Sequence, residues 1–253
     1  MKRVTGIGGV FFKSENVPAL RDWYRDHLGM KVSEWGASFV WGHVDRTKKA
    51  VGQTTWSAFQ SNTDYLKPST HPFMINYRVD DLPQLLETLR KENVEIGDPM
   101  HQYENGKFGW IMDPEGRKVE LWEPVDDRLG DPPQSNEGVT GIGGIFFKSK
   151  NPEAIKAWYK KHLNVGEEFL WRDLSRGGAE AKTMWGAYPE DSILFQNSNK
   201  PFMIQYRVSN VSALLTKLKS EGVKTSDTYD QQPTGKYAGA FDLEGTKLSL
   251  WEP

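Results

Sequence analysis

The stretch VTGIGGVFFKSEN at Val4 to Asn16 returns as VTGIGGIFFKSKN at Val139 to Asn151. A second stretch, PFMINYRV at Pro72 to Val79, returns as PFMIQYRV at Pro201 to Val208. The first pair lies 135 residues apart and the second 129, so one net deletion of six residues, between Tyr159 and Trp185, separates the copies. Each copy is long enough to bury a core of its own, so the repeat predicts two copies of one domain and not a solenoid.

The charge balance of the chain gives it no general attraction to nucleic acids or membrane surfaces. Its 253 residues include 32 Lys and Arg against 34 Asp and Glu, for a net charge of −2. No apolar run is long enough for a signal peptide or for the ~18 residues of a membrane span. Cysteine is absent, which excludes disulfides, thiolate metal ligands and cysteine nucleophiles. We therefore expect a cytoplasmic protein that binds neither nucleic acid nor membranes.

The two copies are predicted to be separate domains joined by a polar segment. The first domain spans residues 1–124, the linker residues 125–138 and the second domain residues 139–253. The linker has two adjacent prolines and no apolar periodicity. Its length lets the copies lie side by side, so we expect them to form an internal pseudo-dimer.

Each copy shows the same order of expected elements. Gly8 to Lys13 is typical of a strand, and Val17 to Leu28 has its apolar residues at helical spacing before Gly29 ends it. Pro72 to Val79 predicts another strand, followed by a helix at Leu82 to Glu92. A hairpin then turns at Asp113-Pro114-Glu115-Gly116. This order predicts an α+β fold in which each copy holds two βαβββ modules.

Three motifs in this order resemble the vicinal oxygen chelate superfamily, which includes glyoxalase I, the extradiol dioxygenases and the bleomycin resistance proteins. They are WY-x-x-H-L at Trp23 to Leu28 and again at Trp158 to Leu163, FMINYRVDDLPQLLETL at Phe73 to Leu89, and DPEGRKVELWEP at Asp113 to Pro124. The resemblance covers nearly the whole chain. It implies tandem glyoxalase/bleomycin-resistance-like domains, whose paired modules curve into an open cup around a ligand.

The resemblance also implies where a divalent metal would bind, because members hold it with His, Glu or Gln side chains at four places. These places fall on Gly9 and Gly144, near Trp56 and Trp185, on Met74 and Met203, and on Glu120 and Ser249. Of the eight residues, only Glu120 is a strong donor for a hard metal. The resemblance therefore implies the fold without the standard metal site, and we expect no cofactor.

Strand alternation independently predicts which side chains line the cups. The predicted lining is mostly aromatic with a few polar groups, which is typical of a small-molecule site. In addition, Gly9 and Gly144 are expected to leave space for a ligand. The predicted ligand-binding residues are Phe11, Trp56, Met74, Asn76, Arg78 and Trp122 in the first cup and Phe146, Trp185, Met203, Gln205, Arg207 and Trp251 in the second.

Glu120 shares the first cup and has three interpretations. It is an inert remnant of a metal site, an ion-pair partner of Arg78 or Lys118, or a base whose pKa is raised by apolar surroundings. The first two are favoured over a catalytic role. Because its counterpart is Ser249, any role it has belongs to one cup only.

Three functions remain open. The first hypothesis is metal-free binding or sequestration of a small apolar or aromatic molecule. The second is an enzyme, either a metal-dependent lyase or dioxygenase with unrecognised ligands or a metal-free isomerase that uses Glu120. The third is an interaction scaffold, because recurring Trp and Met side chains also fill solid cores.

Overall fold

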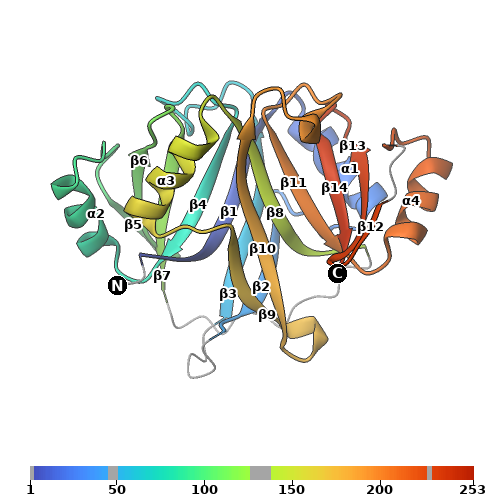
Figure 1. The fold of residues 1–253 in the computed structure, drawn as a ribbon, viewed down its shortest axis with the longest axis horizontal. Coiled ribbons are helices and arrows are strands. Elements are labelled where there is room, and N and C mark those ends of the chain that lie inside the picture. The colour runs from blue at the N-terminus through green and yellow to red at the C-terminus, as the bar shows by residue number, and fades with distance from the viewer. Residues whose placement is uncertain (1–2, 45–50, 126–137, 227–229) are drawn as a thin grey trace.

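The computed structural model describes residues 3–44, 51–125, 138–226 and 230–253 (Figure 1). Almost all of the predicted linker, at residues 126–137, lies outside this described part. The first repeat contains β1 (Val4–Ser14), α1 (Val17–Leu28), β2 (Ala37–Gly42), β3 (Val51–Gln60), β4 (Phe73–Val79), α2 (Leu82–Lys91), β5 (His101–Tyr103), β6 (Gly106–Met112) and β7 (Lys118–Pro124). The second contains β8 (Val139–Ser149), α3 (Pro152–Leu163), β9 (Glu168–Asp173), η1 (Leu174–Arg176), β10 (Ala179–Pro189), η2 (Ile193–Phe195), β11 (Phe202–Val208), α4 (Val211–Ser220), β12 (Asp230–Gln232), β13 (Gly235–Phe241) and β14 (Lys247–Glu252).

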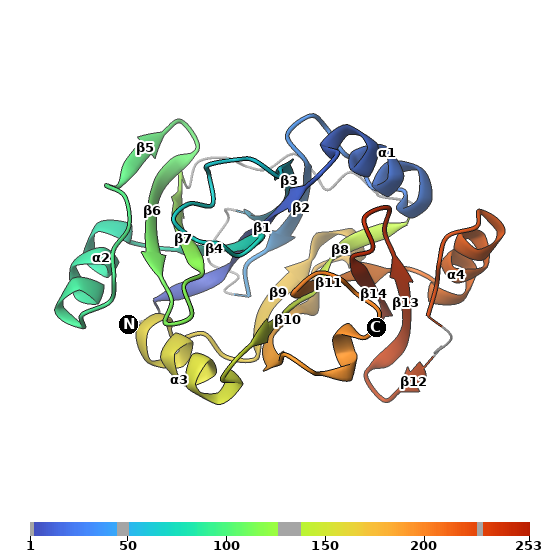
Figure 2. The ribbon, with the colours of Figure 1, turned by 90° about the horizontal axis from the view of Figure 1, so that it is seen from above.

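All of these strands belong to one sheet in the order β12-β13-β14-β11-β8-β10-β9-β2-β3-β1-β4-β7-β6-β5. Each repeat supplies seven consecutive strands, and among the described residues the pair Gly42 and Arg172 joins β2 to β9. Seen from above, the two halves of the sheet curve in opposite directions (Figure 2). The predicted α+β class is confirmed. Between α1 and β4 the described residues hold two strands, so the first module has one strand fewer than the predicted βαβββ pattern.

The helices begin and end where the sequence provides caps. Asn16 accepts a hydrogen bond from the backbone of Ala19 at the start of α1, and Asn151 does the same for α3. Gly29 adopts a left-handed conformation, with φ of 64°, and ends α1 as predicted. No helix in the described part of the chain is both long and apolar enough to cross a lipid bilayer.

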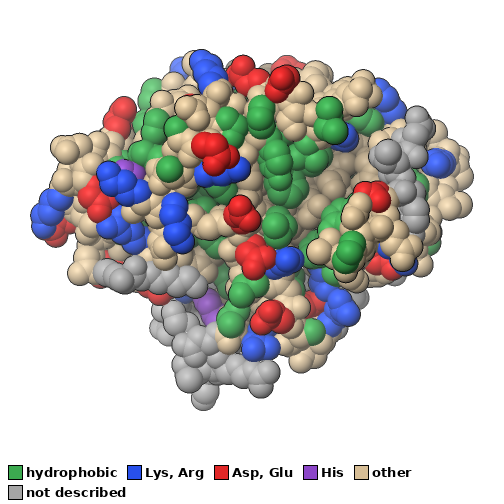
Figure 3. Space-filling model, viewed as in Figure 1, with side chains coloured by type: hydrophobic (Ala, Val, Ile, Leu, Met, Phe, Trp, Pro, Cys, Tyr) green, Lys and Arg blue, Asp and Glu red, His purple; other side chains and the backbone are tan. Residues whose placement is uncertain are grey.

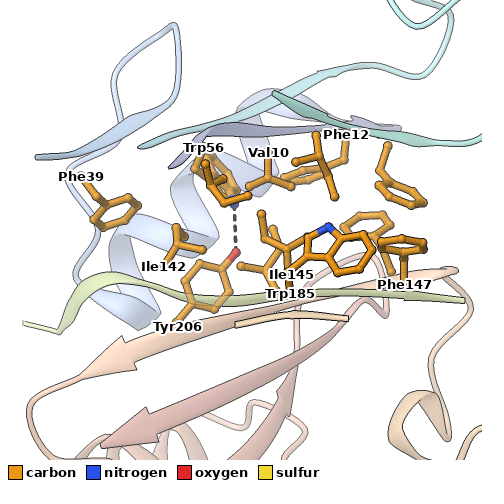
Figure 4. Close-up of a cluster of buried hydrophobic side chains, with 14 of the residues drawn as sticks. Val10, Phe12, Phe39, Trp56, Ile142, Ile145, Phe147, Trp185 and Tyr206 are labelled. Carbon is orange, nitrogen blue, oxygen red and sulfur yellow. Dashed lines mark hydrogen bonds between the residues drawn. The ribbon is translucent and has the colours of Figure 1, made fainter. Parts of the chain in front are cut away.

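The largest hydrophobic core lies between the repeats and is built from both of them (Figure 4). Val10, Phe12 and Trp56 of the first repeat face Ile145 and Phe147 of the second. At full burial, each such side chain contributes on the order of 1.5–3 kcal/mol to the stability of the folded state. The two repeats therefore pack against each other through the convex faces of the two halves of the sheet. The concave face of each half remains available for other contacts.

The contacts across this core are reciprocal. Tyr24 of α1 donates a hydrogen bond to Asp242 at 3.2 Å, and Tyr159 of α3 donates one to Asp113 at 3.1 Å. The predicted hairpin turns take part as well, since Glu115 accepts from Ser149 Oγ at 2.6 Å in the other repeat. Glu244 in the second repeat likewise accepts from Ser14 Oγ at 2.6 Å, so each turn holds the start of the other repeat's first helix.

Candidate ligand-binding site

The predicted alternation in β4 and β7 is confirmed. Phe73, Ile75, Tyr77 and Val79 belong to the core between the repeats, as do Val119 and Leu121. Asn76 and Arg78 of β4, and Lys118, Glu120 and Trp122 of β7, line a cavity on the opposite, concave face. A strand period of two therefore separates the core side chains from the cavity side chains.

This cavity has a volume of about 1760 Å³, and all of its lining residues belong to the first repeat except Val125, the first residue of the linker. Its volume exceeds the roughly 300–1,000 Å³ typical of small-molecule sites, so it accommodates a ligand of several rings. Phe11, Tyr65, Phe108, Trp110 and Trp122 give it aromatic walls. The rings of Phe108 and Trp122 are stacked, with centroids 6.2 Å apart.

Phe11, Asn76, Arg78 and Trp122 thus line the cavity at their predicted positions. Met74 lies on the same face, but it is buried in a cluster with Leu66 and Trp110 at the edge of the cavity lining.

The prediction that Trp56 and Trp185 line the cups is wrong. Trp56 donates a hydrogen bond to the hydroxyl of Tyr206 at 2.9 Å, and Trp185 donates one to Tyr77 at 2.7 Å. Both indoles therefore lie in the core between the repeats. The error is a shift of one residue, because the neighbouring Thr55 lines the cavity, and in a strand a shift of one residue reverses the face.

Glu120 lies at the centre of a hydrogen-bonded row that crosses three strands. Sheet register places Trp110 of β6 and Asn76 of β4 on either side of Glu120. The Asn76 amide donates to Oε1 at 2.6 Å, and the Trp110 indole donates to Oε2 at 2.8 Å. The Tyr65 hydroxyl, from the segment between β3 and β4, also donates to Oε2. The carboxyl group is fully buried, and this burial raises its pKa, while the three hydrogen bonds act in the opposite direction.

Neither of the two expected ion-pair partners hydrogen-bonds Glu120. Arg78 donates to Thr5 and to Asp80, at 2.7 and 2.8 Å. Lys118 donates to the backbone carbonyl of Tyr65 at 3.0 Å, although its positive charge lies close enough to lower the pKa of Glu120. Neutral donors, and not a direct ion pair, hold the carboxyl group.

The second cup lacks this hydrogen-bonded row. Counting 129 residues along the chain, Leu194, Gly239 and Ser249 stand at the places of Tyr65, Trp110 and Glu120. Gln205 replaces Asn76 and donates to Ser249 Oγ at 3.2 Å. The carboxylate and two of its three donors are therefore absent together.

The remaining predicted residues of the second cup pack against its own side chains. Phe146 and Met203 form a buried cluster with Phe195 from η2. Arg207 forms a buried ion pair with Asp173, and Trp251 donates to the Thr234 carbonyl at 3.0 Å. In Figure 3, hydrophobic side chains gather along the middle of the face over β8 and β10.

The two glycines expected to leave space for a ligand do not do so. A Cβ atom added to Gly9 would lie 2.9 Å from the ring of Phe11, and one added to Gly144 would lie 2.7 Å from the ring of Phe146. The aromatic ring two residues along the same strand covers each glycine, so these positions are part of the packed wall.

A feature that the sequence predictions missed is a turn found only in the first repeat. Met30 and Val165 are equivalent, because each donates its backbone N–H to the Tyr carbonyl six residues earlier. Trp41 and Trp171 are also equivalent, since each donates to a Thr hydroxyl on the next strand. In the first repeat, ten residues lie between Met30 and Trp41. In the second repeat, five residues lie between Val165 and Trp171. The extra residues form a turn that carries Trp35 to the edge of the cavity.

The residues at the superfamily's metal-binding places do not fit a metal ion. Gly9 has no side chain, Trp56 lies in the core between the repeats and Met74 is enclosed by apolar groups. Both oxygens of Glu120 already accept hydrogen bonds from the protein. Within residues 3–44, 51–125, 138–226 and 230–253, no three His, Asp or Glu side chains come close enough to hold an ion together.

Tandem repeats that curve into cups define the class of this protein as a two-domain, cup-shaped α+β fold. The model of the Glyoxalase/Bleomycin resistance protein/Dioxygenase superfamily matches residues 8–121. This match covers nearly all of the first repeat, and it agrees with the resemblance of the motifs to the vicinal oxygen chelate proteins. A search of curated protein sequences finds no significant match.

Solved structures with the same fold cover almost the entire chain. The Mn(II)-bound glyoxalase from Novosphingobium aromaticivorans is similar with a TM-score of 0.67 and 12% identity, over 100% of this chain and 83% of that one. The 2,3-dioxygenase LapB from Pseudomonas sp. KL28 has a TM-score of 0.62 and 11% identity, over 100% and 93%. A catechol 2,3-dioxygenase has a TM-score of 0.64 and 14% identity, over 99% and 88%. At these identities the likeness extends to the fold alone.

Sequence reasoning also missed two of the donors to Glu120, Tyr65 and Trp110. The register of the predicted hairpin around Asp113 to Gly116 could have placed Trp110 opposite Glu120, because paired residues of a hairpin share a face. No comparable signal exists for Tyr65, because it lies in an irregular segment between strands.

Proposed function

We propose that the first cup binds a small, largely apolar or aromatic molecule, and that it does so without a metal ion. The observation that carries this proposal is the cavity of about 1760 Å³ with its aromatic walls and its buried polar row. Aromatic walls with a few fixed hydrogen-bonding groups are typical of small-molecule sites. The buried row of Trp110, Glu120 and Asn76 supplies those groups.

Binding or sequestration is favoured over glyoxalase or dioxygenase chemistry because of the donor set. Glyoxalases and dioxygenases are among the proteins with similar structures, and one of these is the Mn(II)-bound glyoxalase. In this chain, Gly9 and Met74 stand at two of the places where the resemblance implies metal ligands. The superfamily name also includes bleomycin resistance proteins, and binding or sequestration is what the resemblance to those proteins implies.

The buried carboxyl group supports a second candidate function, a metal-free isomerase. Burial raises the pKa of Glu120, and a carboxyl group with a raised pKa next to a cavity can exchange a proton with a bound molecule. Its full burial and its three hydrogen bonds favour binding over this candidate. If a ligand of the first cup is found, Glu120→Gln distinguishes the two functions, because it should stop turnover of that ligand and leave its binding largely intact.

A thermal-shift screen of small aromatic compounds tests the binding function. A compound at a hundredfold excess over its dissociation constant should stabilise the folded state by about 2.7 kcal/mol. Trp122→Leu should weaken the shift, because it removes a stacking face and keeps an apolar wall. Trp251→Leu is the matched control at the equivalent place in the second repeat, and it should leave the shift unchanged. If no compound stabilises the chain, or if both variants weaken the shift equally, the proposal fails.

A further inference from the structure

We propose that Trp35 is a specificity-determining residue of the first cup, which contacts flat, multi-ring aromatic molecules across the mouth of the cavity. This inference rests on the proposed binding function and adds to it the residue and the ligand shape.

Trp35 stands out by its exposure. Its side chain is 78% exposed, whereas none of the other nine tryptophans of the chain is exposed. A large aromatic surface held in water is unfavourable, at about 25 cal/mol for each Å² that burial would remove from water. Because Trp35 also lines the cavity, a ligand bound in that cavity would cover part of its exposed ring.

The backbone that carries Trp35 is held firmly. The Trp35 carbonyl accepts a hydrogen bond from Ser57 Oγ at 2.8 Å, which ties the turn to β3. Ser33 and Gly36 exchange backbone hydrogen bonds at 2.8 and 3.2 Å, which closes the turn. Gly36 has φ of 118°, and a Cβ atom there would lie 2.0 Å from the carbonyl oxygen of Trp56, so this close approach requires glycine. The indole is therefore presented from a defined position.

The turn lies across the cup from other aromatic side chains. It leads into β2, at one end of the seven strands of the first repeat, whereas Phe108 and Trp122 lie on β6 and β7 toward the other end. Because the sheet curves, these two ends form opposite walls of the cup (Figure 2). A ligand with several fused rings has flat faces for the stacked Phe108–Trp122 pair on one wall and for Trp35 on the other.

The second repeat supports the assignment by contrast. It has a single residue, Gly166, where the first repeat has the six residues Lys31 to Gly36. The repeat that lacks the turn also lacks the hydrogen-bonded carboxylate row. The turn and the polar row therefore occur together, in the repeat that lines the cavity described above.

A matched pair of probes tests this inference. The flat probe is 2-naphthol, and the control is decahydro-2-naphthol, which has the same carbon skeleton and hydroxyl group but is saturated and puckered. Trp35→Ala should weaken binding of 2-naphthol about two- to twelvefold, which corresponds to aromatic pair energies of ~0.5–1.5 kcal/mol, and should change decahydro-2-naphthol less than about twofold. A variant in which one glycine replaces Lys31 to Gly36, as in the second repeat, should behave in the same way. Ile193→Ala, at an exposed apolar residue of the second repeat, is the surface control and should have no effect.

Acrylamide quenching of tryptophan fluorescence provides a second measurement. The quenching that is lost on Trp35→Phe reports Trp35, and 2-naphthol should protect that component. If Trp35→Ala weakens both probes equally, or neither, this inference fails while the proposed function stands. If neither probe binds the unaltered chain at millimolar concentration, the inference fails, and the thermal-shift screen decides separately whether the proposed function stands. Protection of Trp35 that depends on protein concentration and not on the probe would assign the side chain to a contact between copies, and would also overturn the inference.

Discussion

Trp56 donates its indole N–H to the hydroxyl of Tyr206, 150 residues further along the chain, at 2.9 Å. The reciprocal pair, Trp185 and Tyr77, is joined at 2.7 Å. All four side chains are buried in the core between the repeats. The same residue types that a sequence analysis assigns to a ligand site thus hold the two repeats together.

Tyr206→Phe should destabilise the chain, because it leaves the buried indole N–H of Trp56 without an acceptor. Such an unpaired group costs about 1–3 kcal/mol, and urea unfolding measures the loss. Tyr77→Phe should cost a similar amount in the reciprocal pair. Tyr237→Phe is the control, because its hydroxyl hydrogen bond to Thr234 is exposed. An unfolding free energy of Tyr206→Phe that matches this control would contradict the structural role.

Glu115 should make the stability of the chain depend on acidic pH. Its burial acts to raise the pKa, but hydrogen bonds from Ser149, Asn151 and Arg117 outweigh this and hold the pKa at about 2. Because the folded pKa is lower than the ordinary value of 4.5, the stabilisation is complete above that value and is lost as the pH falls toward 2. Urea unfolding at several pH values between about 6 and 2.5 measures this loss. The unfolding free energy of Glu115→Gln should fall less steeply with decreasing pH than that of the unaltered chain. Parallel curves for the two proteins would exclude this role.

Gly8→Ala should disrupt the polar row of the first cup. A Cβ atom there would lie 2.0 Å from Asn76 Oδ1 and 2.9 Å from the ring of Trp122, so the Asn76 amide must move away. Losing its hydrogen bond to the carboxylate costs about 1.5–3 kcal/mol, which chemical unfolding measures. Gly166→Ala is the control, since nothing lies within 4 Å of the added atom. Equal unfolding free energies for the two variants would show that the Asn76 amide can move away from Glu120 without a loss of stability.

The purified chain should contain no stoichiometric divalent metal, because three of the four ligand places in the first repeat lack a donor. Elemental analysis of untagged protein checks this. Treatment with a chelator should change neither the melting temperature nor the binding of an aromatic ligand. One equivalent of tightly held metal that disappears in Glu120→Ala would overturn the metal-free proposal.

The predictable part of the site is the part that regular strands carry. Alternation in β4 and β7 placed Asn76, Arg78, Glu120 and Trp122 on the cavity side, because a strand has a fixed period of two. The same rule gave no help for Trp56, because the sequence left the register of its strand uncertain by a residue or two. One residue of shift was enough to move it from the cup to the core.

Some of the site depends on segments without a repeating pattern. Tyr65 reaches Glu120 from an irregular segment, and Trp35 reaches the cavity from an inserted turn. Neither position follows from periodicity, because both depend on how a loop folds back over the sheet. Equivalent landmarks in the two repeats, such as Trp41 and Trp171, were needed before the insertion could be located.

By itself, the sequence determined that the chain is a tandem repeat, that each repeat is an α+β unit with motifs that resemble the vicinal oxygen chelate superfamily, and which faces of β4 and β7 are apolar. These features are local or repeated, so spacing and alternation encode them. Only the tertiary structure decided that the convex faces pack together through Trp56 and Trp185, that Glu120 is held by neutral donors, and that the cavity with its Trp35 turn belongs to the first repeat. These features depend on contacts between residues far apart in the chain, whose energies are set by burial and by hydrogen bonds in three dimensions.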